Sequence, residues 1–354
     1  MELPASLQRS LDDTKVEYVN IGRSGLRVSV PVLGGMSFGS KQWAPWVLEE
    51  DDSLKILKAA FDRGINTWDT ANMYSNGISE EIFGKAIQKF NIPREKLVLM
   101  TKCSIYIGEE PGIHGPMLAQ QMSQSKDYVN QGGLSRAAIF NAVEASLARL
   151  NTPYIDLLQI HRYDPTTPPE EVMRALHDLV QTGKVRYIGA SSMWATQFAN
   201  LQFVAEKNGW TKFISMQNLY NLCYREEERE MIRFCNETGV GILPFSPLYG
   251  GILARPLGIN DSIRSTTPSP MVPVLTRADE EIIKRVEHLA GQKGWSMSHV
   301  ALAWLRSKGA VPVVGCNTIS RTDDACNMRG KKLDEEEVKY LEDPYVSRSV
   351  VGHM

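Results

Sequence analysis

Residues 67–90, TWDTANMYSNGISEEIFGKAIQKF, decide the fold of this chain and show where to look for a site. The stretch opens on a short run typical of a buried strand, and an amphipathic helical pattern follows over 79–90. Strand-like and helix-like segments go on alternating in this way along the sequence. This alternation indicates a parallel sheet covered by helices.

The pattern predicts an α/β fold, a single (β/α)8 TIM barrel. A β-hairpin is expected over 18–29, and Gly64, Gly183 and Gly209 follow predicted helices as termination signals. We interpret 1–17 as an N-terminal extension, 18–345 as the barrel domain and 346–354 as a C-terminal tail. Strands are predicted near 32–35, 67–69, 97–101, 155–160, 185–190, 213–217, 241–245 and 311–314. Helices are predicted near 51–63, 79–90, 136–150, 169–182, 194–207, 226–238, 279–293 and 320–329.

Two connections are longer than is usual between a strand and its helix. Segment 103–135 follows the third predicted strand, and segment 253–277, rich in proline, follows the seventh. Loops after barrel strands rise above the catalytic face and form substrate pockets. Both segments are therefore expected over the site, with a passive insertion as the alternative for each.

Polar side chains stand at or just after the ends of several predicted strands. Asp69 and Tyr74 follow the second strand, Lys102 ends LVLMTK, and His161 ends IDLLQIH. In a parallel barrel the carboxyl ends of the strands converge on one face, so these residues should form one cluster. A lysine ammonium favours the phenolate of a nearby tyrosine, and a carboxylate keeps that lysine charged. A histidine can orient a carbonyl oxygen or relay a proton.

Each of these residues also has an ordinary structural interpretation. Asp69 could cap the next helix, Tyr74 and His161 could pack in the core, and Lys102 could be a surface charge. The functional interpretation depends on all of them falling at strand ends in one order. Together they suit the reduction of a carbonyl group.

Composition is that of an ordinary globular protein. The chain has 354 residues, of which 43% are hydrophobic and 23% charged, so a sizeable core is expected. The net charge of −2 gives no reason to expect nucleic acid or an acidic membrane as a partner.

The cysteines and the N-terminus bear on the compartment. The five cysteines are odd in number and lack CxxC spacing, which favours reduced thiols over a disulfide framework or a zinc site. The N-terminus MELPASLQRSLDDTK has no apolar core of a signal peptide, and no apolar run approaches the ~18 residues of a membrane span. The sequence therefore predicts a cytoplasmic protein.

Motifs along most of the chain resemble those of the aldo-keto reductase superfamily. DTANMYSNGISEEIFGKAI resembles its first signature, and the order Asp, Tyr five residues on, Lys and then His fits its catalytic tetrad. The character of GSKQWAPWV, GLSRAAI, LLQIHRYD, VRYIGASSMWATQF and YNLCYREEEREMI is closest to the fungal aryl-alcohol dehydrogenase-like branch. The resemblance runs from about residue 18 to about residue 345. It implies a barrel whose floor is closed by the N-terminal hairpin.

The cofactor prediction starts from an absent motif. No GxGxxG joins a predicted strand to a helix, so a Rossmann domain is not expected. A barrel can instead bind an extended dinucleotide through backbone amides near its last strands. In PFSPLYGGILARP, Gly250 and Gly251 permit close approach to a pyrophosphate, and Ser246 and Leu248 offer amides. By itself this motif is weak, because turns of Pro and Gly are common.

The resemblance adds roles for individual residues. It implies that Phe245 stacks on the nicotinamide, and that Ser192 and Gln217 hold its carboxamide. Hydroxyl and amide side chains have the chemistry for that task.

The adenosine end is expected after the eighth strand. By the family's pattern Arg321 faces the 2′-phosphate of NADP(H), Asp324 bonds the adenine or ribose, and Gly315 lies near a helix N-terminus that favours an anion. Many relatives have lysine where Gly315 stands and asparagine where Ala325 stands. The predicted cofactor is NADP(H), with a weakened set of contacts at this end.

The function that the resemblance implies is NADPH-dependent, reversible reduction of aldehydes, aromatic and aliphatic, and also of ketones. Tyr74 is the expected general acid. Trp43 and Trp46 are expected to wall an aromatic substrate, with plain packing as the alternative. The expected partner is a small carbonyl compound, and no metal ligand cluster is seen. The oligomeric state and the physiological substrate are left open.

Two other functions share this kind of fold. One is a cofactor-binding, redox-sensing regulatory subunit, which an intact tetrad disfavours. The other is a metal-dependent hydrolase, which needs a ligand set such as two histidines and a carboxylate at strand ends. Only His161 is placed in that way.

Overall fold

The computed structural model describes residues 3–259, 263, 267 and 274–353. Its main sheet has eight parallel strands in the spatial order β10-β3-β4-β5-β6-β7-β8-β9. The strands are β3 (Val32–Gly34), β4 (Thr67–Asp69), β5 (Val98–Cys103), β6 (Ile155–Ile160), β7 (Val185–Ser191), β8 (Ser215–Gln217), β9 (Gly241–Ile242) and β10 (Val313–Val314). Each lies within a few residues of its predicted position.

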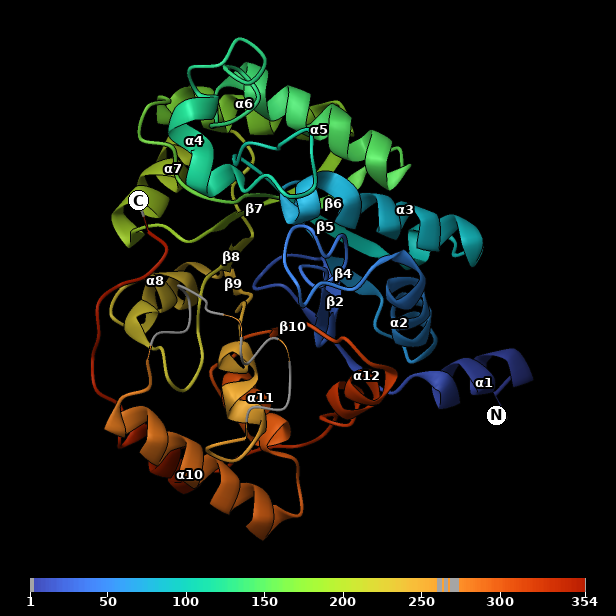
Figure 1. Ribbon diagram of the computed structural model, residues 1–354, viewed down its shortest axis with the longest axis vertical. Helices are drawn as coiled ribbons and strands as arrows, with labels where there is room; N and C mark the ends of the chain where they lie inside the picture. Colours follow the sequence, from blue (N-terminus) through green and yellow to red (C-terminus); the bar gives the residue numbers. More distant parts are fainter. Residues whose placement is uncertain (1–2, 260–262, 264–266, 268–273, 354) are drawn as a thin grey trace.

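Backbone hydrogen bonds also join the two ends of this sheet. The amide of Val311 donates to the carbonyl of Ile242 over 2.8 Å, and the amide of Val313 donates to the carbonyl of Pro244 over 2.9 Å. The segment around β9 therefore pairs with the segment around β10. The sheet curls into the predicted (β/α)8 barrel, with helices on its outside (Figure 1).

The helices follow the strands in the expected alternation, with additions. Among the described residues they are α1 (Ala5–Asp13), α2 (Glu50–Asp62), α3 (Ile78–Lys89), α4 (Gly115–Met122), α5 (Arg136–Leu150), α6 (Pro169–Gln181), α7 (Ala195–Lys207), α8 (Met231–Thr238), α10 (Arg277–Lys293), α11 (Met297–Ser307), α12 (Ile319–Cys326) and α13 (Glu335–Glu342). Short 3₁₀ turns are η1 (Tyr74–Gly77), η2 (Arg94–Lys96), η3 (Glu226–Glu228) and η4 (Tyr249–Ala254).

Helix ends are set by local chemistry. Ser135 caps α5 by accepting a hydrogen bond from the amide three residues on, and Thr318 does the same for α12. Gly64, Gly183 and Gly209 adopt left-handed φ angles of 93°, 76° and 65° just after α2, α6 and α7. Glycine reaches this conformation without steric cost, so the predicted termination signals are confirmed.

The predicted hairpin is β1 (Glu17–Asn20) paired antiparallel with β2 (Arg27–Val30). The amide of Ser29 donates to the hydroxyl of Thr67, the first residue of β4, over 3.0 Å. Gly22 has a φ of 53°, and a Cβ there would lie 2.3 Å from the carbonyl oxygen of Gly239, just before β9. The hairpin therefore packs closely against the N-terminal ends of the strands, where it closes the barrel floor.

One predicted helix needs correction, and α1, α4, α11 and α13 were not predicted. The predicted helix 226–238 is broken into η3 and α8. Helix α11 was not predicted because its sequence MSHVALAWLRS is buried on nearly all sides, with Val300, Leu302 and Trp304 at most 1% exposed. A helix buried all round has no polar face, so its period is hidden.

The long loops differ in what can be described. Segment 103–135 contains α4 and is described throughout. Much of segment 253–277 lies outside the described residues.

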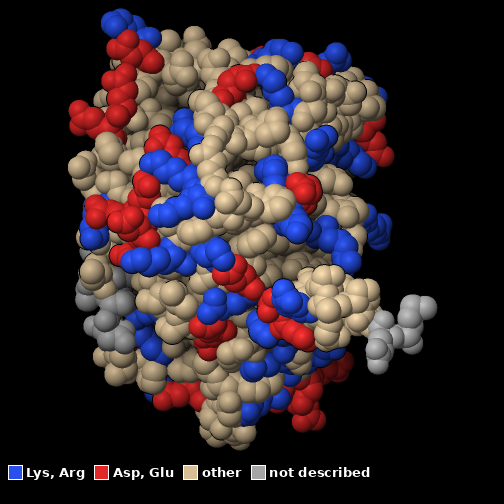
Figure 2. All heavy atoms as spheres, turned by 90° about the vertical axis from the view of Figure 1, so that its right-hand side faces the viewer, with Lys and Arg blue, Asp and Glu red and all other residues tan. Residues whose placement is uncertain are grey.

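No helix in the described ranges is long and apolar enough to cross a membrane. On the face shown in Figure 2, acidic and basic side chains are interspersed. That face therefore carries no broad field of one sign.

Candidate active site

A buried ion pair stands at the C-terminal ends of β4 and β5. The Nζ of Lys102 lies 2.6 Å from Oδ2 of Asp69, and it also donates to the carbonyl of Thr70 over 2.9 Å. Burial alone would lower the pKa of Lys102, but the charge of Asp69 and the neighbouring Tyr74 outweigh it and raise the pKa. Lys102 is therefore a permanent cation inside the barrel mouth.

A layer of amides supports this pair from across the barrel. Gln159 Nε2 in β6 and Gln217 Nε2 in β8 donate to Asp69 Oδ1 over 3.0 and 3.2 Å, and Gln217 also donates to Gln159 over 3.1 Å. These bonds satisfy the second carboxylate oxygen. Gln159 was missed in the sequence, although a glutamine inside the apolar run IDLLQI is a detectable signal.

Tyr74 is held over Lys102 by an unusual turn. Ser75, Asn76 and Gly77 follow it with left-handed φ angles of 49°, 53° and 99°. The Lys102 Nζ lies 5.3 Å from the centroid of the Tyr74 ring. Such a run of left-handed residues persists only where surrounding contacts hold it, and it is common near functional groups.

The net effect on the Tyr74 pKa differs from what Lys102 alone would do. Burial raises the pKa of the hydroxyl, and this exceeds the lowering by the Lys102 ammonium. Lys102 does lower the pKa of Tyr74, as expected, but burial raises that pKa by more. Tyr74 therefore stays protonated at neutral pH, which is the form a proton donor requires.

His161 completes the cluster at the end of β6. Its ring meets the Tyr74 ring edge to face, with centroids 6.0 Å apart and planes at 83°. Burial, and then the nearby charges of Arg162 and Lys102, hold the pKa of His161 well below its usual range. Its buried Nδ1 has no hydrogen-bond partner in the described part of the chain. A neutral imidazole with a free ring nitrogen is suited to orienting a polar group.

The predicted aromatic wall packs beside Tyr74. The Trp43 ring lies 6.3 Å from the Tyr74 ring, 6.0 Å from Trp46 and 5.6 Å from His114, between centroids. Trp43 is buried and Trp46 is partly exposed. The long segment 103–135 supplies His114, so Trp43 lies between this segment and Tyr74.

The side chain of Asn76 holds residues 108–113 of that loop through hydrogen bonds. Its Nδ2 donates to the carbonyls of Glu110 (2.7 Å), Pro111 (3.3 Å) and Ile113 (2.8 Å), and its Oδ1 accepts from the amide of Gly108 (2.9 Å). The side chain therefore pairs with backbone groups at four positions of this loop. Segment 108–113 is an ordered wall fixed to the η1 turn.

The residues predicted to hold a carboxamide lie at the ends of β7 and β8. Ser192 is buried with a left-handed φ of 44°, and its amide donates to Asn218 Oδ1 over 3.1 Å. The Nε2 of Gln217 instead donates hydrogen bonds to Asp69 and Gln159. Ser192 is therefore shaped by a neighbour, Asn218, that sequence reasoning did not single out.

The loop after β9 has the features of an anion cradle. Gly250 and Gly251 adopt φ angles of 68° and 91°. The amides of Ser246 and Leu248 make no hydrogen bond with any described residue. Phe245, at the start of this loop, is partly buried. Free amides beside glycines can bind phosphate oxygens, so the loop fits a pyrophosphate.

The predicted adenosine end lies at the N-terminus of α12. Arg321 is exposed, and its Nη1 donates to Asn317 Oδ1 over 2.7 Å. Gly315 is also exposed, and a Cβ there would meet only Ser37 Oγ, at 4.0 Å. Asp324 accepts from Ser296 Oγ over 3.3 Å and lies 3.2 Å from His299 Nε2. Its carboxylate therefore links α12 to α11, a role that the sequence did not indicate.

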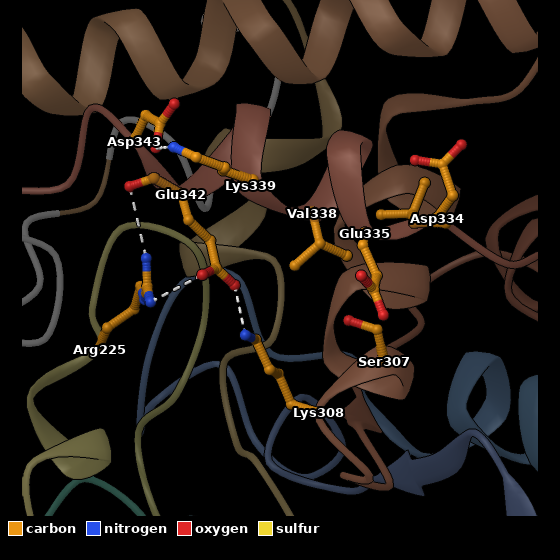
Figure 3. Close-up of a pocket in the computed structure, with 10 residues that line it drawn as sticks. Arg225, Ser307, Lys308, Asp334, Glu335, Val338, Lys339, Glu342 and Asp343 are labelled. Atoms are coloured by element: carbon orange, nitrogen blue, oxygen red, sulfur yellow. Dashed lines mark hydrogen bonds and ion pairs between the residues drawn. The ribbon is translucent and has the colours of Figure 1, made fainter.

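A hollow of about 550 Å³ lies away from these residues (Figure 3). Much of its charged lining is mutually paired: Glu342 lies 2.5 Å from Lys308 and 3.1 Å from Arg225, and Lys339 lies 2.6 Å from Asp343. This hollow contains no member of the tetrad. Among the described residues, no three His, Cys, Asp or Glu side chains are grouped so as to hold a metal ion.

The barrel and the cluster of Asp69, Tyr74, Lys102 and His161 suit an oxidoreductase, and comparison with known proteins identifies the family. Residues 32–345 match the Aldo/keto reductase family, to which the chain belongs. An aldo-keto reductase of Fusarium vanettenii is 53% identical over 360 residues, covering 100% of this chain and 97% of that protein. The versiconal hemiacetal acetate reductase of Aspergillus parasiticus is 50% identical over 341 residues (95% and 98%). A putative aryl-alcohol dehydrogenase of Schizosaccharomyces pombe is 50% identical over 349 residues (95% and 98%).

These relatives confirm the predicted resemblance to the aryl-alcohol dehydrogenase-like branch. Family membership and the reductase names support an oxidoreductase that reduces small carbonyl compounds. The family generally uses a nicotinamide dinucleotide.

Proposed function

We propose that the protein reduces aldehydes, both aromatic and aliphatic, and ketones to alcohols with NADPH, reversibly, and that Tyr74 is the general acid. The observation that carries this proposal is that the Tyr74 ring lies against the ammonium of Lys102, which is itself paired with the buried Asp69. A protonated tyrosine, a fixed cation and a neutral histidine meet there. This is the donor set that a developing alkoxide requires.

The side chains have separate tasks in this mechanism. The hydroxyl of Tyr74 and the ring of His161 hold the carbonyl oxygen, and Tyr74 gives its proton to that oxygen as negative charge develops. The Lys102 ammonium then stabilises the phenolate left on Tyr74, and Asp69 keeps Lys102 charged. The bound cofactor supplies the hydride. In the reverse direction the same phenolate accepts the proton of the alcohol.

The cofactor fits a band of residues around the last four strands. We propose that Ser192 and Gln217 face the carboxamide and Phe245 the nicotinamide ring. Ser246, Leu248 and Gly250 would hold the pyrophosphate. The amides of Ser246 and Leu248, which have no partner among the described residues, support this. Gly315, Arg321 and Asp324 would then face the adenosine. An exposed arginine at a helix N-terminus suits the 2′-phosphate of NADPH.

Oxidation of NADPH by a panel of aliphatic and aromatic aldehydes tests the proposal. The expected result is multiple turnover with several aldehydes, and slower turnover with NADH in place of NADPH. Retention of NADPH without aldehyde-dependent turnover would contradict it and favour a redox-sensing subunit. The relatives named for a hemiacetal acetate and for aryl alcohols support including both kinds of substrate in the panel.

A further inference from the structure

The last described residues form a strap, which we define as 344–353. Figure 1 shows this segment, in red, running from the neighbourhood of α10 to that of α7. The strap begins just after α13, whose last residue, Glu342, pairs with Arg225 and Lys308 (Figure 3). The strap is therefore anchored before it reaches the barrel mouth.

The backbone of the strap follows the segment after β8. The hydroxyl of Tyr345 and the amide of Arg348 both donate to Oε1 of Glu226, each over 2.8 Å. Further along, the amide of Val351 donates to the hydroxyl of Tyr224 over 2.9 Å. These bonds set the register of the strap on the barrel.

One side chain of the strap reaches the loop after β9. Arg348 Nη1 donates to the hydroxyl of Tyr249 over 2.9 Å, and Nη2 donates to Asp279 Oδ1 over 2.6 Å. Tyr249 is 1% exposed, and its amide donates to the carbonyl of Ser246 over 2.9 Å. Arg348 therefore fixes the anion cradle to the N-terminal turn of α10.

A second side chain reaches the end of β7. His353 Nε2 lies 2.9 Å from Glu227 Oε1, and the His353 ring meets the Trp194 ring at 4.8 Å. The other oxygen of Glu227 accepts from Asn218 Nδ2 over 2.5 Å, and Asn218 Oδ1 accepts the amide of Ser192. Through Glu227 and Asn218, these contacts link His353 to the backbone amide of Ser192.

Both loops that the strap supports carry strained backbone. Ser192, Ser246 and Tyr249 are not glycines, yet they adopt left-handed φ angles of 44°, 50° and 49°. Such conformations persist only where the surroundings over-determine them. The strap is part of those surroundings, because Arg348 bonds Tyr249 directly and His353 reaches Ser192 through Glu227 and Asn218.

We propose that Arg348 and His353 are positioning residues for cofactor binding, because they hold both of these loops in their binding conformation without being among the proposed cofactor contacts. This inference rests on the proposed placement of the cofactor along Ser192 and 245–251. Groups held in place before binding bind more tightly, since less order has to be imposed on association. The strap would act on cofactor affinity without touching the cofactor.

The test compares NADPH dissociation constants, measured by quenching of tryptophan fluorescence, for Arg348→Met, Tyr249→Phe, the double variant and Val346→Ala. Val346 is on the same strap, is 63% exposed and is the matched control. The bonds of Arg348 are charge-assisted, so Arg348→Met should weaken NADPH roughly tenfold or more. Tyr249→Phe should weaken it less. The double variant should be no worse than Arg348→Met alone, because Arg348→Met already breaks the bond that Tyr249→Phe removes.

His353→Ala tests the contacts that lead from His353 to Ser192, in the same assay. It should also raise the dissociation constant for NADPH, while Val346→Ala should not. Thermal melting without cofactor accompanies each variant. A lower melting temperature with unchanged NADPH affinity, in Arg348→Met and in the milder Tyr249→Phe, would overturn the inference and leave the strap a purely structural element. If the wild-type protein itself does not bind NADPH, the proposed function fails rather than the role of the strap.

Discussion

Replacing Asp69 with asparagine isolates the ion pair on which the proposed site depends. The pair joins Lys102 Nζ to Asp69 Oδ2 over 2.6 Å, and the two side chains are only 1% and 3% exposed. Asparagine has the same size, and its remaining oxygen can still accept from Gln159 and Gln217. With that oxygen kept in place, the new Nδ2 donor faces the Lys102 ammonium, so the substitution removes both the negative charge and the acceptor of Lys102.

The expected cost follows from the burial of the pair. Breaking a buried ion pair by removing one partner destabilises a protein by about 3–5 kcal/mol, because the other charge stays buried without compensation. Lys102→Met should cost a comparable amount. The double variant removes both charges, and its loss should be far smaller than the sum of the two single losses.

Urea unfolding of the wild type, both single variants and the double variant at neutral pH measures this coupling. The four free energies form a double-mutant cycle that needs neither cofactor nor substrate. Additive losses, or a loss below about 1 kcal/mol for Asp69→Asn, would refute a strongly coupled buried pair.

Further predictions address the cofactor, the loop and the histidine. Arg321→Ala should weaken NADPH by roughly 1.5–3 kcal/mol and NADH little, since its charge-assisted contact needs the 2′-phosphate; equal losses in both titrations would place Arg321 elsewhere. Asn76→Gly keeps the left-handed backbone but removes the side chain that binds segment 108–113. Amide hydrogen exchange in that segment should therefore speed up, and the ratio of kcat/KM for aromatic over small aliphatic aldehydes should change. Unchanged exchange would mean that Asn76 does not hold the loop. Because burial depresses the pKa of His161, the imidazole should stay neutral as pH falls through 6.5, the ordinary histidine pKa, and protonate only well below it; a ring that titrates in labelled-histidine NMR near its ordinary value would contradict this.

Much of the fold could be predicted because its signals are local. Several barrel strands, such as β5 and β6, contain short apolar runs, and Gly64, Gly183 and Gly209 mark helix ends through their own φ preference. Helix α11 escaped prediction because it is buried nearly all round, so no polar face reveals its period.

The cluster of the tetrad could be predicted for a topological reason. Asp69, Lys102 and His161 end parallel strands, and such ends meet at one face. Gln159 and Asn218 were not predicted because their roles depend on partners in other elements of the barrel, Asp69 for Gln159 and Ser192 for Asn218. The same holds for the strap, whose contacts join residues that are distant in sequence.

The net direction of the Tyr74 pKa was also beyond the sequence. Proximity of Lys102 predicts a lowering, and that contribution is present. Burial depends on how completely the surrounding loops cover the ring, which only the three-dimensional arrangement reveals. In the structure burial prevails.

The central claim is that Tyr74 donates the proton that accompanies hydride transfer. Single-turnover oxidation of bound NADPH by an aromatic aldehyde, compared between the wild type and Tyr74→Phe, tests it most directly. The substitution removes only the hydroxyl, so NADPH affinity should be retained while the rate falls by about 10²–10⁴-fold, the usual contribution of general acid catalysis. A rate close to that of the wild type, with NADPH bound equally well, would contradict the account.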